Sequence, residues 1–309
     1  MVERLLVTGG NGFLGSYLVE KALNQGFEVV VVDDLSTSSC INVPKDAKFV
    51  RCKVEEFSDD TRYDFVAHFA ARPSPEDYMK HPVETMLSNS LGTLRTLEIA
   101  KRSNAVYLYA SSSEVYGDAS VIPTPEDYFG YVNPVGVRSC YDEGKRFSEA
   151  LCMAYHRQFG LDVRIERPFN VYGPRMRADG VYGRVIPRFL SQALAGKELT
   201  VHGDGNQTRS FLFVHDWLEA TWTLLTKPGL SAQVVNIGSP NEVKILELAK
   251  LVIKVTKSSS KIVFLPPRPE DPRRRAADIT RARSLLSWEP RTSLEEGLKT
   301  TAEWLSRAS

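Results

Sequence analysis

The sequence predicts an α/β protein built on a doubly wound parallel sheet, and three observations support this fold class. Short apolar runs are typical of strands at 4–8, 27–34, 48–52, 63–71 and 105–113. A long helical stretch from about Pro82 to Arg102 lies between the last two runs. A glycine-rich turn comes directly after the first run. Strands and helices that alternate in this way form parallel sheets, and ligands bind at the carboxyl ends of the strands.

The turn "TGGNGFLG" at 8–15 contains Gly9, Gly12 and Gly15, and it leads into an amphipathic stretch that begins with Phe13 and Leu14. In a dinucleotide-binding turn, the first glycine permits the tight turn and the second lets the backbone approach a pyrophosphate. The third lets the helix pack closely on the strand. A glycine triplet alone is a weak signal. The strand before it and the helix after it predict a Rossmann-type cofactor site at these five residues.

The second strand ends at Asp33, roughly 20 residues after the glycine turn, where this fold places the acid that binds the adenosine ribose. A carboxylate at this position accepts hydrogen bonds from the ribose hydroxyls and repels a 2′-phosphate. The sequence therefore predicts NAD, rather than NADP, as the cofactor.

Composition and charge exclude several classes of protein. Hydrophobic residues make up 42% of the chain and charged residues 25%, as in an ordinary globular enzyme. The formal net charge of +1 provides no field for nucleic acid or an anionic membrane, and no apolar run approaches the roughly 20 residues that span a bilayer. The chain begins without a signal segment, and its four cysteines include no C-x-x-C pair. We therefore expect a cytoplasmic protein with free thiols and no metal site.

Tyr141 and Lys145 are four residues apart in "SCYDEGKR", about one helical turn, so their side chains would share a helix face. A tyrosine titrates near pH 10, and a neighbouring ammonium would lower its pKa toward that of a usable base. The alternative is a surface tyrosine and lysine on an ordinary helix. The spacing alone does not decide between these interpretations. The predicted strand end at Ser112, Ser113 and Glu114 supplies the context, because it lies where a nicotinamide would bind.

Five motifs together resemble the extended short-chain dehydrogenase/reductase family that acts on nucleotide sugars. They are "TGGNGFLG", "NSLGT" at 89–93, "SSSEVYG" at 111–117, "YDEGK" and "RPFNVYGPR" at 167–175, and they occur in the family's order over essentially the whole chain. The resemblance implies a Rossmann domain over 1–170, to which later segments return. It also implies a smaller C-terminal α/β lobe over 171–309 that binds the nucleotide sugar.

The same resemblance implies roles for individual residues. Tyr141 would accept the proton of the sugar C4 hydroxyl, Lys145 would lower the tyrosine pKa and hold the nicotinamide ribose, and Ser112 would orient the hydroxyl. Further cofactor contacts are implied for Ala70, Asn89 and Pro168, and substrate contacts for Asn170, Arg209 and Arg275.

Members of this family share the oxidation at C4 and differ in the next step, and Glu114 discriminates among them. The 4,6-dehydratases have an adjacent Asp–Glu pair, whereas this chain has Ser113 and Glu114. The 4-epimerases tend to have a small or apolar residue at the glutamate position. The combination of serine and glutamate, together with "YDEGK" and "ARPSPEDYMKHPVET" at 71–85, resembles the UDP-glucuronate decarboxylases, which form UDP-xylose through a 4-keto intermediate. By this resemblance, Arg275 would contact the substrate carboxylate region, and Ser113 with Glu114 would support ring distortion or protonation.

Three positions depart from the pattern of these decarboxylases. Lys53 replaces an expected aspartate near the adenine, His202 replaces an expected tyrosine beside the base, and Phe129 replaces a tryptophan. The segment "RRRAADI" at 273–279 also lacks the usual proline.

Two rival functions remain open from the sequence. One is a UDP-hexose or UDP-uronate 4-epimerase that has kept a glutamate at 114. The other is a catalytically silent NAD-binding sensor, which is disfavoured because such proteins usually lose the tyrosine or the lysine. A homodimer is expected by analogy with relatives that pair two helices per subunit into a four-helix bundle.

Overall fold

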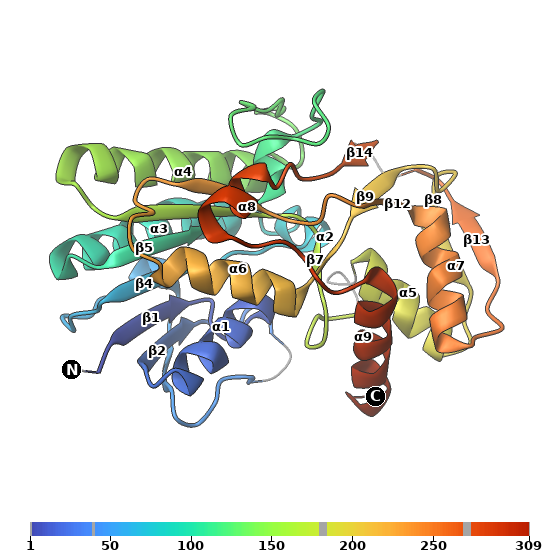
Figure 1. The fold of residues 1–309 in the computed structure, drawn as a ribbon, viewed down its shortest axis with the longest axis horizontal. Helices are drawn as coiled ribbons and strands as arrows, with labels where there is room; N and C mark the ends of the chain where they lie inside the picture. Colours follow the sequence, from blue (N-terminus) through green and yellow to red (C-terminus); the bar gives the residue numbers. More distant parts are fainter. Residues whose placement is uncertain (1, 39–40, 179–183, 268–272, 309) are drawn as a thin grey trace. The chain divides into compact units, whose positions relative to one another are not determined.

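The computed structural model describes residues 2–38, 41–178, 184–267 and 273–308 (Figure 1). Cys40 lies outside the described residues, as do residues 179–183, 268–272 and 309 of the predicted substrate lobe. The chain forms two compact units. The first consists of Met1–Val115, Val132–Arg167 and Leu218–Val235, and the second of Tyr116–Tyr131, Pro168–Trp217 and Asn236–Ser309.

The first unit is organised by a seven-stranded sheet with the strand order β11-β6-β5-β4-β1-β2-β3. The chain starts in the middle of this sheet and is wound outward on both sides, and the neighbouring strands from β3 to β6 run parallel. The predicted doubly wound α/β fold is therefore confirmed. The strands are β1 (Arg4–Thr8), β2 (Glu28–Asp33), β3 (Lys48–Arg51), β4 (Phe65–His68), β5 (Val106–Ala110), β6 (Val163–Pro168) and β11 (Val234–Ile237).

Helices cover both faces of this sheet, as Figure 1 shows. On one face lie α3 (Pro82–Ser103) and α4 (Ser139–Phe159), which pack against each other. On the other lie α1 (Phe13–Asn24) and the part of α6 (Val214–Thr226) that belongs to this unit. Short helical turns complete the unit: η1 (Val54–Glu56), α2 (Pro75–Tyr78) and η2 (Ser113–Tyr116).

Helix boundaries are set by local chemistry. α3 begins at a proline, which lacks the amide hydrogen that a first-turn residue cannot use, and it ends before Asn104, whose φ is 53°. α4 ends before Gly160, whose φ of 69° closes the helix in the left-handed region. The predicted helical stretch from Pro82 to Arg102 is thus confirmed within one residue.

The second unit contains short strands and helices. Arg274–Arg275 (β14) lies parallel to Thr208–Ser210 (β9), which pairs on its other edge with Glu242–Lys244 (β12). Two further pairs are β7 (Val171–Tyr172) with β10 (Leu212–Phe213), and β8 (Leu199–His202) with β13 (Ile262–Leu265). The helices are α5 (Val185–Leu194), α7 (Ile245–Thr256), α8 (Thr280–Leu286) and α9 (Leu294–Ala308).

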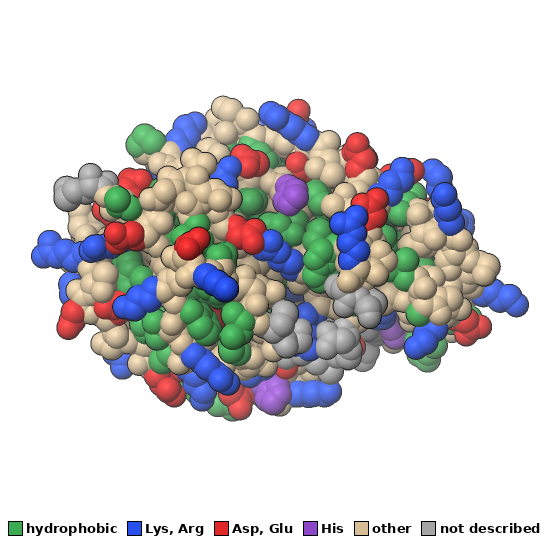
Figure 2. Space-filling model, turned by 90° about the horizontal axis from the view of Figure 1, so that it is seen from below, with side chains coloured by type: hydrophobic (Ala, Val, Ile, Leu, Met, Phe, Trp, Pro, Cys, Tyr) green, Lys and Arg blue, Asp and Glu red, His purple; other side chains and the backbone are tan. Residues whose placement is uncertain are grey.

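Charges of both signs intermix over the face drawn in Figure 2. This distribution agrees with the near-zero formal net charge of +1. Among the described helices, none combines the length and the apolar character needed to cross a membrane.

Candidate active site

The glycine turn between β1 and α1 leaves no room for side chains. Gly9 has a φ of 71°, and a Cβ there would come within 2.6 Å of the Ala70 backbone nitrogen. A Cβ on Gly15 would lie 2.3 Å from the Gly9 carbonyl oxygen. Gly12 precedes α1, and its amide donates to the same carbonyl at 3.1 Å. Three predicted cofactor residues therefore form a tight turn at the start of α1, with Ala70 packed against it.

Phe13 and Leu14 are the first two residues of α1, so their amides are among those that a helix leaves without intrahelical partners. Such a helix start is suited to an anionic group such as a pyrophosphate.

Asp33 ends β2 beside this turn. Its carboxylate accepts hydrogen bonds from the Asn11 amide at 3.1 Å and the Leu35 amide at 2.9 Å. Burial raises the pKa of the Asp33 carboxyl, and the two backbone donors oppose that shift. The backbone thus orients the carboxylate at the carboxyl end of the strand. The tight turn, the helix start and this acid fit the pyrophosphate and ribose of a dinucleotide.

Asn89 lies on α3 and is fully buried. Its amide donates to the Thr85 carbonyl at 2.8 Å, and its oxygen accepts from the Tyr109 hydroxyl at 3.3 Å. A Cβ on Gly144 of α4 would meet the Asn89 side chain at 3.2 Å. Asn89 therefore lies at the close approach of α3 and α4, in contact with β5. Pro168, another predicted cofactor residue, ends β6.

The η2 turn follows the carboxyl end of β5. Ser112 accepts a hydrogen bond from the Glu114 amide at 3.2 Å, and Ser113 is buried as the first residue of η2. The Glu114 carboxylate forms an ion pair with Arg138 at 2.5 Å. The carboxylate predicted to decide the reaction is therefore paired with an arginine for which the sequence predicted no role.

Tyr141 and Lys145 both lie on α4 and are buried. The Lys145 ammonium donates to the Ala110 carbonyl at 2.7 Å and lies 5.8 Å from the centre of the Tyr141 ring. Burial lowers the pKa of Lys145 to about 7, and the Glu149 carboxylate partly opposes this shift. The structure therefore places the ammonium beside the tyrosine ring, as the spacing of one helical turn predicts.

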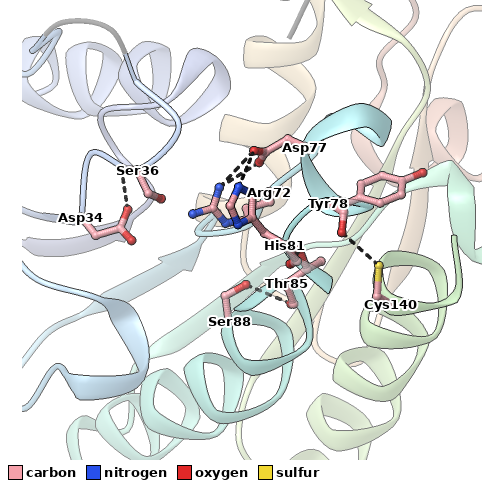
Figure 3. Close-up of polar contacts among 9 residues, drawn as sticks. All are labelled: Asp34, Ser36, Arg72, Asp77, Tyr78, His81, Thr85, Ser88 and Cys140. Atoms are coloured by element: carbon pink, nitrogen blue, oxygen red, sulfur yellow. Dashed lines mark hydrogen bonds and ion pairs between the residues drawn. The ribbon is translucent and has the colours of Figure 1, made fainter. Parts of the chain in front are cut away.

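Tyr78 stands out in the sequence only as part of a motif, yet it packs directly on Tyr141. The two rings stack at 5.0 Å between centroids with an interplanar angle of 8°. Tyr78 ends α2, which is tied on one side by an ion pair between Arg72 and Asp77 at 2.9 Å. On the other side, the Cys140 thiol donates to the Tyr78 carbonyl at 3.5 Å (Figure 3). These links hold the stacked ring against the helix that carries Tyr141.

Glu149 is a second residue that the sequence motifs did not reveal. It accepts two hydrogen bonds from Arg167, at 2.9 and 2.6 Å, and one from Ser111 at 2.5 Å. Its position one turn after Lys145 is a signal that could have identified it. Through these contacts it joins the end of β5, the middle of α4 and the end of β6.

The second unit brings together the three predicted substrate residues. Arg209 and Arg275 are register partners in the parallel strands β9 and β14, and both are buried. Register partners in neighbouring strands project to the same face of a sheet. Asn170, whose φ is 41°, donates to the carbonyl of Ser210, next to Arg209, at 2.9 Å. Two buried cations on one face favour an anionic ligand.

The structure describes the three residues that depart from the family pattern. Lys53 is half exposed and lies 3.9 Å from Glu56. The His202 ring contacts the Pro266 carbonyl at 3.1 Å. Phe129 is 91% exposed. Among the described residues, no group of three or more His, Cys, Asp or Glu residues could hold a metal ion.

The fold and this glycine turn are those of an NAD-dependent enzyme, and the chain belongs to the NAD dependent epimerase/dehydratase family, whose model matches residues 5–238. It is 44% identical to UDP-glucuronic acid decarboxylase 1 from Danio rerio over 310 aligned residues, which cover 99% of this chain and 73% of that protein. Solved structures of similar fold include UDP-glucose 4-epimerase from Thermotoga maritima with UDP-glucose, at a TM-score of 0.92, 32% identity and 99% coverage of both chains. Another is UDP-glucuronic acid 4-epimerase from Bacillus cereus in complex with UDP-glucuronic acid and NAD. It has a TM-score of 0.88 and 30% identity, and the match covers 99% of this chain and 100% of that one.

Proposed function

We propose that this chain is an NAD-dependent UDP-glucuronate decarboxylase that forms UDP-xylose through a 4-keto intermediate. The observation that carries the proposal is Glu114, a carboxylate at the end of β5 held by Arg138 one turn before Tyr141. A partly buried carboxylate is costly without a partner or a task, so its presence in the turn after β5 is informative. Identity to the Danio rerio decarboxylase, at 44%, also exceeds identity to the two epimerases, at 32% and 30%.

The first unit would bind NAD and carry out the chemistry. The glycine turn, Asp33, Ala70 and Asn89 of this unit would contact the cofactor, and Pro168 at the end of β6 is a further proposed contact. When bound, NAD accepts a hydride from the sugar C4 and later returns one to it. The support for this assignment is the tight turn without space for side chains and the carboxylate oriented by two backbone amides.

Tyr141 would accept the proton of the C4 hydroxyl while Ser112 orients that hydroxyl. Lys145 supports this role because its ammonium lies beside the tyrosine ring, where its charge stabilises a phenolate. The resulting C4 ketone is β to the C6 carboxylate. The C5–C6 bond can then break, with release of CO₂ and transfer of the electron pair into an enolate.

Glu114 and Ser113 would act at the next stage, in which C5 takes up a proton and the enolate returns to a ketone. Tyr141 would then give its proton back to the C4 oxygen as the ketone is reduced, which would complete the pentose. Every proton and electron pair is then accounted for: one carboxylate leaves as CO₂, and one solvent-derived proton takes its place.

The second unit would bind the UDP-sugar. Its support is the pair of buried arginines, Arg209 and Arg275, with Asn170 beside the same strand. UDP-glucuronate carries a diphosphate and a carboxylate, which both suit the planar fork of a guanidinium. We assign Arg209 with Asn170 to the diphosphate and Arg275 to the side nearer the carboxylate.

The alternative function is a 4-epimerase, favoured by the solved epimerase structures at 30% to 32% identity. The deciding experiment incubates the purified protein with UDP-glucuronate and NAD and monitors the sugar by proton NMR. A pentose spectrum together with CO₂ release supports the decarboxylase. A galacturonate spectrum, or conversion of UDP-glucose alone, would replace it with the epimerase.

We further propose a homodimer formed through α3 and α4. Five apolar side chains of α3 are exposed, and Phe147 of α4 is 51% exposed. The α3 residues, with exposures of 37–65%, are Val83, Met86, Leu87, Leu91 and Leu94. An apolar stripe along two adjacent helices is costly in water and suits a second copy of the same surface. Sedimentation analysis should give a dimer for the wild-type protein and a monomer for Leu91→Glu. A monomeric wild-type protein would contradict the proposal.

The proposed location is the cytoplasm. Its support is the free state of Cys52, Cys140 and Cys152, because oxidising compartments favour disulfides. Cell fractionation with an antibody to the chain tests this location.

A further inference from the structure

We propose that Arg138 is a positioning residue that holds Glu114 in its ionised, reaction-ready orientation, an inference that rests on the decarboxylase function proposed above. The Arg138 guanidinium and the Glu114 carboxylate lie 2.5 Å apart, although 24 residues separate them in the chain. Their side chains are only 15% and 19% exposed. A pair this sheltered from water is screened far less than a surface ion pair, so it fixes both the charge and the direction of the carboxylate.

The backbone of Arg138 has a separate task. It is the residue before α4, and its carbonyl accepts hydrogen bonds from the Tyr141 amide at 3.0 Å and the Asp142 amide at 3.1 Å. The main chain of Arg138 therefore caps the start of the helix that carries Tyr141, and its side chain forms the ion pair with the Glu114 carboxylate. A substitution of Arg138 removes the ion pair with Glu114, but its backbone carbonyl can still accept the hydrogen bonds from Tyr141 and Asp142.

The charges around the pair explain why a cation is needed there. Tyr78 on α2 is close enough to sense Arg138, Glu114, Asp142 and Tyr141. Burial raises the pKa of the Tyr78 hydroxyl far above its ordinary value, so it stays neutral. The two carboxylates near it, Glu114 and Asp142, both oppose a further negative charge, whereas Arg138 favours one. Removal of Arg138 would therefore leave the Glu114 carboxylate without this cation, and Glu114 would take up a proton more readily.

Arg146 offers a matched control. It lies on α4 and also reaches toward the segment after β5, but its guanidinium donates to the Val115 carbonyl at 3.0 Å and lies 3.4 Å from Glu143. Arg146→Met removes a similar guanidinium and a link between the same two segments, without removing the partner of Glu114. A general loosening of α4 would affect both arginine variants alike.

The experiment compares the wild-type protein, Arg138→Met, Arg138→Lys, Glu114→Gln, the double variant Arg138→Met/Glu114→Gln, and Arg146→Met. Release of CO₂ from UDP-glucuronate and reduction of bound nicotinamide are recorded separately over a pH series. Carbon NMR of glutamate-labelled protein gives the titration midpoint of Glu114, whose signal is assigned by its loss in Glu114→Gln. This last measurement needs no turnover.

Arg138→Met should lower the rate of CO₂ release roughly 10- to 100-fold, which is at or below the lower limit of the roughly 10²- to 10⁴-fold that a positioned acid–base group supplies. Reduction of nicotinamide should change little. The Glu114 midpoint should rise by about one pH unit or more, and the acid limb of the rate profile should move with it. Arg138→Lys should recover part of the rate. The double variant should be no slower than Glu114→Gln, because residues that act as a unit are not additive.

Three results would overturn the role of Arg138. The first is an unchanged Glu114 midpoint in Arg138→Met. The second is a loss in the double variant equal to the product of the single losses, and the third is a rise in KM alone; either of these would assign the arginine to direct contact with the substrate. Failure of the wild-type protein to release CO₂, with nicotinamide reduction intact, would instead overturn the proposed function itself.

Discussion

Replacement of Lys145 by methionine should abolish turnover and yet stabilise the nucleotide-free protein at neutral pH. The lysine is buried, and its pKa falls from 10.5 to about 7 because burial disfavours the charged ammonium. A group with a lowered pKa in the folded state binds fewer protons there than in the unfolded state. The free energy of unfolding of the wild-type protein should therefore rise between about pH 7 and 10.5 and stay low below pH 7.

The size of the effect can be worked out from the shift. Each pKa unit corresponds to about 1.36 kcal/mol, so a fall from 10.5 to about 7 is worth roughly 5 kcal/mol at most. Methionine fills a similar volume without charge, but it loses the hydrogen bond to the Ala110 carbonyl, a loss of about 1 kcal/mol. We therefore expect Lys145→Met to exceed the wild-type protein by about 4 kcal/mol below pH 7. The difference should shrink as the pH approaches 10.5.

Urea unfolding of both proteins at a series of pH values measures this difference directly. The control is Lys250→Met, because the Lys250 side chain is 57% exposed and pairs with a surface glutamate at 2.8 Å, and its removal should change stability by less than about 1 kcal/mol. Parallel pH curves for the wild-type protein and Lys145→Met, or a less stable Lys145→Met at pH 7, would refute the reasoning from burial.

Three further predictions concern the other groups of the site. Tyr141→Phe should lower the rate of nicotinamide reduction roughly 10²-fold or more, measured by single-turnover absorbance, while calorimetry should show that NAD still binds. A rate of reduction equal to that of the wild-type protein would show that Tyr141 is not the base. Gly15→Ala should weaken NAD binding and destabilise the fold by roughly 1–3 kcal/mol, because its Cβ would lie 2.3 Å from the Gly9 carbonyl; unfolding curves and NAD titration test this. Arg209→Met and Arg275→Met should each weaken UDP-glucuronate binding roughly tenfold or more without a change in NAD affinity, both measured by calorimetry. Variants that bind UDP-glucuronate as tightly as the wild-type protein would exclude these arginines from the substrate site.

Local sequence patterns predicted the parts of the fold whose cause is local. The glycine turn is dictated by space within a few residues, since a Cβ on Gly15 would strike the Gly9 carbonyl. The placement of Tyr141 and Lys145 is set by helical periodicity alone. The ion pair between Glu114 and Arg138 has no such local cause, because it spans 24 residues and depends on how α4 approaches the end of β5. No periodicity marks a contact of this kind.

The run Arg273–Arg275 contains arginines in different environments, which the sequence alone does not distinguish. A basic run can be a solvated face or a binding site, and the sequence leaves both interpretations open. In β14, successive side chains point to opposite faces. Arg274 is exposed and pairs with Glu242, whereas Arg275 is buried next to Arg209 in register. The alternation of side chains along a strand determines which arginine is buried. This rule could not be applied from the sequence, because the sequence did not identify this short segment as a strand.

The distribution of functional groups between the units bears on how one fold supports several reactions. Ser112, Glu114, Arg138, Tyr141 and Lys145 all belong to the first unit, whereas Arg209 and Arg275 belong to the second. If the proposed roles hold, a change in the segment after β5 would alter the fate of the 4-keto sugar without any change in the two arginines of the second unit. Such a division of roles would be consistent with chains of similar fold, with TM-scores of 0.92 and 0.88, that are named 4-epimerases, and with a 44% identical relative that is named a decarboxylase. Under the proposed function, the fold would provide oxidation at C4, and the short segment from Ser112 to Glu114, with Arg138 that pairs with Glu114, would select the product.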